Sequence, residues 1–253
     1  MQDDPIEETV EQTVEEPRLA SFHLVREPAW CAPVALARLG TDRLRLRGTP
    51  GLRFARLLGT GSGAAATGAD LARSALFAVW DGAAALAAFE DETDGWFGRR
   101  AARVRARGGE AYALHLALLS GHGRWGGRDV LAELGRDPAA DPDGPVAVLT
   151  RATVRPSRWH RFRGSRPPVS AELAAASGLR AAVAIGEAPI GLQATFSLWA
   201  DGGAVTAFAR SPRHRDVVRR TRRENWYGEE LFARFAPLRS SGTRDGGDPL
   251  ADR

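Results

Sequence analysis

Two stretches of the sequence decide the fold: ALFAVWDGAAALAAF at Ala75–Phe89 and ATFSLWADGGAVTAF at Ala194–Phe208. Their aromatic residues match at one offset of 119 positions (196 − 77, 199 − 80 and 208 − 89): Phe77 with Phe196, Trp80 with Trp199, and Phe89 with Phe208. A repeat of this length indicates two duplicated units rather than a solenoid, whose period is about 20–50 residues. We therefore expect two similar halves.

Hydrophobic patterning predicts the same order of elements, β-α-β-β-α-β, on both sides of the repeat. In the first half, residues 19–135, the expected strands and helices are Ser21–Arg26, Ala32–Leu46 (helix), Leu52–Gly59, Ser74–Trp80, Ala83–Arg107 (helix) and Ala111–Leu119. In the second half, residues 146–238, they are Val146–Val154, Pro156–Ser177 (helix), Leu179–Gly186, Leu192–Trp199, Gly203–Arg223 (helix) and Leu231–Leu238. This order is the ferredoxin-like pattern.

The predicted strands are apolar on both faces, so the sheet face that the helices leave open must also be buried. Two sheets in one chain can cover each other. The sequence therefore predicts an α+β fold in which two tandem ferredoxin-like βαββαβ halves form an intramolecular dimeric α+β barrel. We expect its interior to be large enough for a ligand.

Three segments lie outside these halves. Residues 1–18 are acidic and offer almost nothing to bury, which predicts a disordered tail. Residues 136–145 are rich in Asp, Pro and Gly and are expected to be a linker. Residues 239–253 are polar and are also expected to be disordered.

Composition excludes several classes of protein. No run approaches the roughly 18–20 apolar residues of a spanning helix, and the N-terminus lacks the apolar segment of a secretory signal. The single cysteine, Cys31, excludes intramolecular disulfides and cysteine-based zinc or iron–sulfur sites. Because no export signal is found, we expect a cytoplasmic protein. All 35 basic residues are Arg and no nucleic-acid-binding motif accompanies them. Peripheral membrane association is the better interpretation of this charge than nucleic acid.

The five histidines, which are His23, His115, His122, His160 and His214, show no close pairing with metal-ligand spacing. A haem site needs one imidazole, so single candidates remain open. His115 lies at an alternating position of a predicted strand and could face the interior, although a satisfied core or surface histidine is the simpler interpretation. His214 lies in the last predicted helix between Arg213 and Arg215, where solvent exposure is the competing interpretation.

Other candidates concern the substrate. Trp80 and Trp199 end equivalent strands, and their large rings suit an extended apolar ligand, although core packing explains them equally simply. Glu187 ends a strand in the turn IGEAP, where it could orient a ligand or stabilise the turn.

Seven blocks of the sequence resemble the spheroidene monooxygenase family, and they follow one another in the same order as in that family. They are Phe54–Gly61, Gly123–Arg128, Leu149–Pro156, Ile185–Pro189, Gln193–Asp201, Ala207–Arg210 and Trp226–Phe235. The resemblance spans about residues 20–238. It departs from the family at Ile190-Gly191 and at Phe162-Arg163, which affects the identity of the substrate more than the fold.

The resemblance implies a monooxygenase that introduces a hydroxyl and then a keto group at C-2 of an acyclic carotenoid. It also implies haem and an external electron donor such as ferredoxin. His214 matches the family's histidine before the last helix, so it is the expected haem ligand, with His115 in reserve. Two alternatives stay open: a non-catalytic protein that binds haem or an apolar ligand in the same barrel, and a cofactor-independent monooxygenase.

Overall fold

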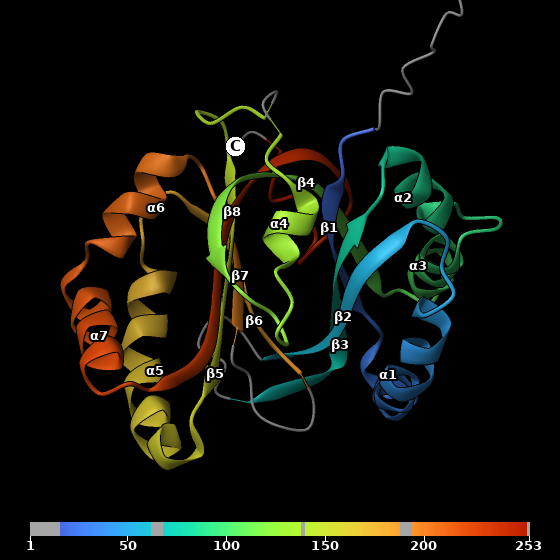
Figure 1. Cartoon of the computed structure of the whole chain (residues 1–253). Coiled ribbons are helices and arrows are strands. Elements are labelled where there is room, and N and C mark those ends of the chain that lie inside the picture. Colours follow the sequence, from blue (N-terminus) through green and yellow to red (C-terminus); the bar gives the residue numbers. More distant parts are fainter. Residues whose placement is uncertain (1–15, 62–67, 138–139, 188–193, 252–253) are drawn as a thin grey trace, which may run out of the picture.

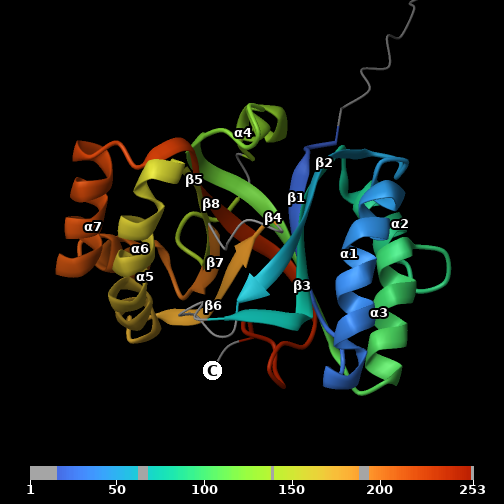
Figure 2. The ribbon, with the colours of Figure 1, turned by 90° about the horizontal axis from the view of Figure 1, so that it is seen from below.

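The computed structural model describes residues 16–61, 68–137, 140–187 and 194–251. Within them, eight strands form a closed antiparallel barrel in the order β1-β3-β2-β6-β7-β5-β8-β4. Two groups of helices flank the barrel on opposite sides, α1 to α3 on one and α5 to α7 on the other (Figure 1). The view from below in Figure 2 shows the same three layers. The fold is therefore α+β, as predicted.

The elements follow the predicted order, and the four strands of the N-terminal half and the last strand of the chain are longer than expected. The N-terminal half contains β1 (Leu19–Arg26), a 3-10 turn (Ala29–Cys31), α1 (Ala32–Leu46), β2 (Leu52–Gly61), β3 (Ala69–Trp80), α2 (Ala83–Glu90), α3 (Trp96–Ala106) and β4 (Glu110–Gly123), and is followed by α4 (Val130–Leu134). The C-terminal half contains β5 (Val146–Val154), a 3-10 turn (Pro156–Arg158), α5 (Trp159–Ala174), β6 (Leu179–Gly186), β7 (Ala194–Trp199), α6 (Gly202–Ala209), α7 (Pro212–Arg223) and β8 (Tyr227–Gly242).

The two halves use the same internal strand order. Going round the barrel, the second, third, first and fourth strands of each half are neighbours, β2-β3-β1-β4 and β6-β7-β5-β8. Trp80 lies opposite Leu19 and Leu52 in the first half, and Trp199 lies opposite Val146 and Leu179 in the second. β2 pairs with β6, and β4 pairs with β8, which closes the barrel.

The barrel interior is filled by side chains rather than by a ligand-sized space, so our expectation of a ligand site there is wrong. Phe22 of β1 stacks on Phe196 of β7 with ring centroids 3.8 Å apart and planes 5° apart. Phe77 lies between Trp125 and Phe235, with centroids 5.7 and 6.0 Å away. Among the described residues, these rings belong to one cluster of buried side chains at the centre of the barrel.

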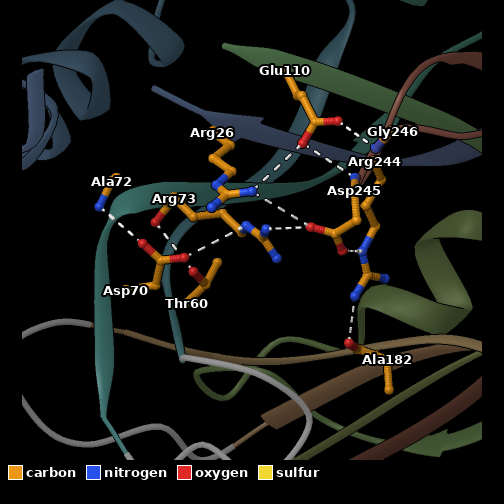
Figure 3. Close-up of polar contacts among 10 residues, drawn as sticks. All are labelled: Arg26, Thr60, Asp70, Ala72, Arg73, Glu110, Ala182, Arg244, Asp245 and Gly246. Atoms are coloured by element: carbon orange, nitrogen blue, oxygen red, sulfur yellow. Dashed lines mark hydrogen bonds and ion pairs between the residues drawn. The ribbon is translucent and has the colours of Figure 1, made fainter. Parts of the chain in front are cut away.

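The segment from residue 239 belongs to the fold, which corrects the expected disordered tail. β8 runs on to Gly242 and pairs there with Tyr112 of β4. Beyond it, Arg244 donates to the carbonyl oxygen of Ala182 at 2.5 Å, and Asp245 forms an ion pair with Arg73 at 2.8 Å (Figure 3). The polar residues that favoured disorder are thus the ones that anchor the segment, because their partners lie on the barrel.

The other predicted segments fare differently. Most of the predicted acidic tail, residues 1–15, lies outside the described residues, and β1 begins at Leu19. The predicted linker at 136–145 follows α4, a short helix that the sequence analysis missed. Among the residues that the structure describes, no helix combines the length and the apolar character needed to cross a bilayer.

Candidate functional site

A cavity of about 360 Å³ lies between the outer face of the C-terminal half of the sheet and the helices α5 to α7. Its lining is mainly apolar, with contributions from β5, β7 and all three helices: Val148, Ala152, Val169, Leu173, Ala184, Trp199, Val205, Phe208, Val217, Val218 and Phe232. The volume lies within the range of small-molecule and cofactor sites, roughly 300–1,000 Å³. This cavity is the candidate functional site.

Helix α7 turns one face toward the cavity. His214, Val217, Val218 and Thr221 line it, and their spacing of three, four and seven positions places them on one side of a helix. Arg213 and Arg215 are exposed, because neighbouring helical residues point about 100° apart. The helix therefore presents His214 to the cavity although two arginines flank it in sequence.

The surroundings of His214 favour a neutral imidazole. The ring lies beside Phe208, with centroids 4.8 Å apart, and the backbone N–H of His214 donates to Glu172 Oε2 at 3.1 Å. Burial lowers the pKa of His214 below the ordinary histidine value, and the charge of Glu172 offsets only part of this effect. A neutral imidazole has a free nitrogen lone pair, which a metal ion requires of a histidine ligand.

Cationic side chains border the same cavity. Arg151 is buried and pairs with Glu229, which also accepts hydrogen bonds from the backbone N–H groups of Gly126 and Gly127 at 2.8 and 2.7 Å. Arg222 lines the cavity and is exposed. The cavity is thus lined by two imidazoles, the half-buried His214 and the exposed His122, by an apolar wall, by two guanidiniums and by the carboxylate of Glu230.

These groups suit haem. Haem needs a single protein ligand, an apolar slot and cations for its carboxylates. Within the described ranges, no three His, Cys, Asp or Glu side chains are grouped as a metal site of their own.

The two predicted tryptophans have different surroundings. Trp199 lines the cavity, donates from Nε1 to Ser197 Oγ at 2.9 Å and packs against Phe208. Trp80 does not line it: its side chain is completely buried beneath α2, where Nε1 donates to Ser21 Oγ at 2.8 Å. Of the two tryptophans, only Trp199 lines this cavity.

Glu187 does not line the cavity either. Its Oε1 accepts hydrogen bonds from Trp125 Nε1 at 3.0 Å and Arg56 Nε at 2.9 Å. The carboxylate therefore joins the start of the N-terminal half's β2 to the loop that follows β4. Of the two roles that the sequence left open for Glu187, these contacts fit the structural one.

His115 faces the helix layer and not the barrel interior, although the sequence had left the inward orientation open. Its Nε2 lies 2.8 Å from Glu90 Oε2, and His23 Nε2 lies 2.7 Å from Glu90 Oε1. Burial by itself would raise the pKa of Glu90, but the hydrogen bonds from His115 and His23 outweigh it and lower that pKa to about 2. Burial also lowers the pKa of His23. The carboxylate is therefore ionised and occupied by both imidazoles.

Sequence reasoning missed most residues of the cavity wall. Val217, Val218 and Thr221 carry a readable signal, because they follow His214 at helical spacing. Arg151 carries none, since a single Arg in a predicted strand does not reveal its partner Glu229, 78 positions away.

Comparison with known proteins identifies the chain's relatives. No family model matches it. The spheroidene monooxygenase of Rhodobacter capsulatus is 35% identical over 232 residues, which cover 87% of this chain and 90% of that protein. This chain belongs to the spheroidene monooxygenase family. The family's enzyme from Rubrivivax gelatinosus is 36% identical over 200 residues, covering 79% of this chain and 74% of its own length.

Solved structures support the fold at much lower sequence identity. A crystal structure of aldoxime dehydratase superposes with a TM-score of 0.59 at 10% identity and covers 87% of this chain and 81% of its own. A second aldoxime dehydratase, in complex with butyraldoxime, gives a TM-score of 0.55 at the same identity and covers 87% and 79%. The fold is shared with these proteins. Membership of the spheroidene monooxygenase family makes the chain a monooxygenase.

Proposed function

We propose that the chain is a haem-dependent monooxygenase that introduces a hydroxyl and then a keto group at C-2 of an acyclic carotenoid. The relatives' name supports the carotenoid substrate. The observation that carries the haem assignment is the half-buried, neutral imidazole of His214 on an apolar cavity. We place the reaction in that cavity, between α7 and the outer face of the C-terminal strands.

The chain's own residues would hold the cofactor and the substrate. His214 would ligate the iron through its imidazole, and Arg151 and Arg222 would bind the haem carboxylates, because a guanidinium engages both oxygens of a carboxylate. When bound, haem supplies the activation of O₂. Trp199, Phe208 and the valines of α7 would exclude water and contact the polyene.

The proposed reaction needs an electron donor and access to a lipophilic substrate. Reduction of O₂ consumes electrons, for which an external donor such as ferredoxin is proposed. We further propose that the protein works in the cytoplasm, where peripheral contact with a membrane would bring it to its lipophilic substrate.

We propose that residues 19–135 and 146–238 are tandem ferredoxin-like βαββαβ halves, which together make the dimeric α+β barrel within one chain. Their identical strand order and the matching positions of Trp80 and Trp199 support this origin. Superposition of the two halves on each other in an experimental structure tests it, with Trp80 and Trp199 expected to coincide.

The functional test combines spectroscopy and product analysis. The chain is reconstituted with haem, scanned across the Soret region and then supplied with an acyclic carotenoid, a reductant and O₂. We expect a ligated-haem spectrum and an oxygenated product from the wild type, and loss of both in His214→Ala. His115→Ala, whose side chain lies outside the cavity, is the matched control and should keep the wild-type spectrum. Wild-type spectra and haem affinity in His214→Ala would overturn the ligand assignment, and haem binding without product would favour the non-catalytic alternative.

A further inference from the structure

A second hollow, lined largely by arginine, lies on the N-terminal half. This groove has a volume of about 530 Å³ and lies between the end of α1, the start of β2 and the loop after β4. Its charged lining residues are Arg43, Arg47, Arg53, Arg56, Arg128 and Glu187. We call it the arginine groove. The proposed function uses none of its arginines.

Two of these arginines are held in place over an aromatic ring. The guanidinium carbon of Arg56 lies 4.4 Å from the ring centroid of Phe54, and that of Arg128 lies 5.5 Å from the same centroid. Phe54 is itself buried. Stacked guanidiniums are oriented before a ligand arrives, so they lose less freedom when they bind a planar or tetrahedral anion.

The charge of the groove is only partly neutralised. Arg53 pairs with Asp81, Arg56 with Glu187 and Arg128 with Glu133. These ion pairs do not include Arg43, in the last turn of α1, or Arg47, just after that turn. Both are exposed, and neither forms an ion pair with any residue that the structure describes. The groove therefore carries two free positive charges beside three partly neutralised ones.

An exposed apolar side chain lies in the same last turn of α1, although it does not line the groove. Leu44, between Arg43 and Arg47 in sequence, is 65% exposed, one of the most exposed large apolar residues in the described part of the chain. Positive charge together with an exposed leucine on a helix is the combination that binds a lipid interface, because the cations meet the headgroups and the leucine enters the acyl boundary.

Contacts connect the groove with the cavity. Arg56 pairs with Glu187, Glu187 accepts from Trp125, and the guanidinium of Arg151 lies 5.5 Å from the ring centroid of Trp125. Arg151 lines the cavity. A continuous row of side-chain contacts thus joins the groove to the cavity.

We propose that the arginine groove binds the phosphate headgroup of an anionic phospholipid and holds the protein on a membrane surface. The choice of a lipid over other phosphate sources rests in part on the proposed function, since a carotenoid substrate is itself lipophilic. The binding chemistry does not depend on catalysis, so it is tested without haem or substrate.

The experiment measures partition of the full chain onto phosphatidylcholine vesicles made with and without phosphatidylglycerol. The variant R43Q/R47Q removes the two unpaired charges and no hydrogen bond or ion pair of the fold. The control R107Q/R136Q removes two other exposed arginines that do not line the groove, so both variants change the net charge equally. Parallel arms offer inorganic phosphate and a polyglutamate peptide.

We expect binding only to vesicles with phosphatidylglycerol, weakened by added salt. R43Q/R47Q should lower the partition coefficient roughly thirty-fold, since each basic residue at an anionic surface contributes about 1 kcal/mol, while R107Q/R136Q should stay near the wild-type value. Equal losses in both variants would show a diffuse charge effect and overturn the proposal, as would no vesicle binding. Groove-dependent binding of phosphate alone, or of polyglutamate alone, would reassign the groove to a free phosphate ester or to an acidic protein.

Discussion

The two helical layers cover equivalent strands in different ways. Beneath α2 and α3, the space over the N-terminal strands is filled by Phe89, Phe97 and a polar network around Glu90. Beneath α6 and α7, the corresponding space over the C-terminal strands remains hollow and is lined by His214. The strand order is the same in both halves, so the strands do not decide where a cavity forms.

The helices decide in which half a cavity forms. α3 packs Phe97, Ala101 and Val104 against its sheet at helical spacing, and all three are buried. α7 presents His214 and Val217 at the same kind of spacing, but both remain half-buried beside the cavity. A duplicated framework can therefore keep one solid layer for stability while the other layer is hollowed for a ligand.

The polar network of the N-terminal half is satisfied along its whole length. Trp80 Nε1 donates to Ser21 Oγ, Ser21 lies 3.4 Å from His23 Nδ1, and His23 Nε2 reaches Glu90. With His23 neutral, Ser21 can donate to Nδ1 while Nε2–H donates to the carboxylate, which His115 meets from the other side. Every donor in this hydrogen-bonded network has an acceptor. This is why a layer with two histidines and a glutamate can be buried.

The largest effect is expected when the cavity beneath α6 and α7 is filled by a larger side chain. We expect Val217→Trp to abolish haem binding, because the indole would occupy the space beside His214. Thermal stability should be kept, since the new side chain enters an existing cavity. Haem titration followed at the Soret band, together with thermal unfolding, checks this. Arg219→Trp places the same side chain on the exposed part of α7 and should bind haem normally; loss of binding there would point to a general effect of the new tryptophan.

Removing the central carboxylate should disrupt the solid layer. We expect Glu90→Ala to lower the free energy of unfolding by about 3–4 kcal/mol at pH 7, because His23 would keep a buried N–H without an acceptor. Urea unfolding measures the change. Haem affinity should not change, since Glu90 does not line the cavity. A strong loss of affinity would mean that the two layers are energetically coupled.

The same network predicts how stability depends on pH. The pKa of Glu90 falls from 4.5 to about 2 on folding, so its contribution is fully present above about pH 4.5 and is lost as the pH falls toward 2. This shift corresponds to about 3 kcal/mol at most. The lowered pKa of His23 acts in the same direction, starting below about pH 6.5. Unfolding free energies of the wild type and Glu90→Gln between pH 7 and 3 test this, and parallel curves for the two proteins would contradict it.

The smallest contrast concerns the paired tryptophans. Trp80→Phe and Trp199→Phe each remove an indole N–H that donates to a serine. We expect Trp80→Phe to cost about 1 kcal/mol more, because its surroundings are solid and a new void cannot be shared with an existing cavity. Chemical denaturation of the two variants measures the difference. Equal costs would mean that the cavity beside Trp199 does not relieve the substitution.

The sequence predicted the strand and helix order because strong local patterns determine it. The aromatic repeat located β3, β7 and the helices after them, and helical spacing made an inward His214 possible between two arginines. Alternation also showed that His115 and Leu114 lie on opposite faces of β4. It could not show which face is inside, because both faces of that strand are apolar, so the orientation of His115 stayed open.

Two further features depend on long-range contacts that composition does not show. The segment after β8 is polar, and only the positions of Arg73 and Ala182 on the barrel explain why it is held. The packed interior likewise depends on Phe22 meeting Phe196 across the barrel, a contact between distant strands. Patterning within one strand predicts that a side chain is buried, but not what it is buried against.

The position of β8 in the barrel has a consequence for synthesis on the ribosome. β8 pairs with β4 on one side and with β5 on the other. Tyr112 of β4 pairs with Gly242 of β8, which is synthesised 130 positions later (242 − 112). Every other strand of the barrel is therefore made before β8, which lies between β4 and β5 and completes the ring. Until β8 arrives, β4 and β5 present open edges, which are sites for pairing with other chains. The nascent chain is thus most exposed to aggregation late in translation, and we expect slow closure with a strong dependence on chaperones.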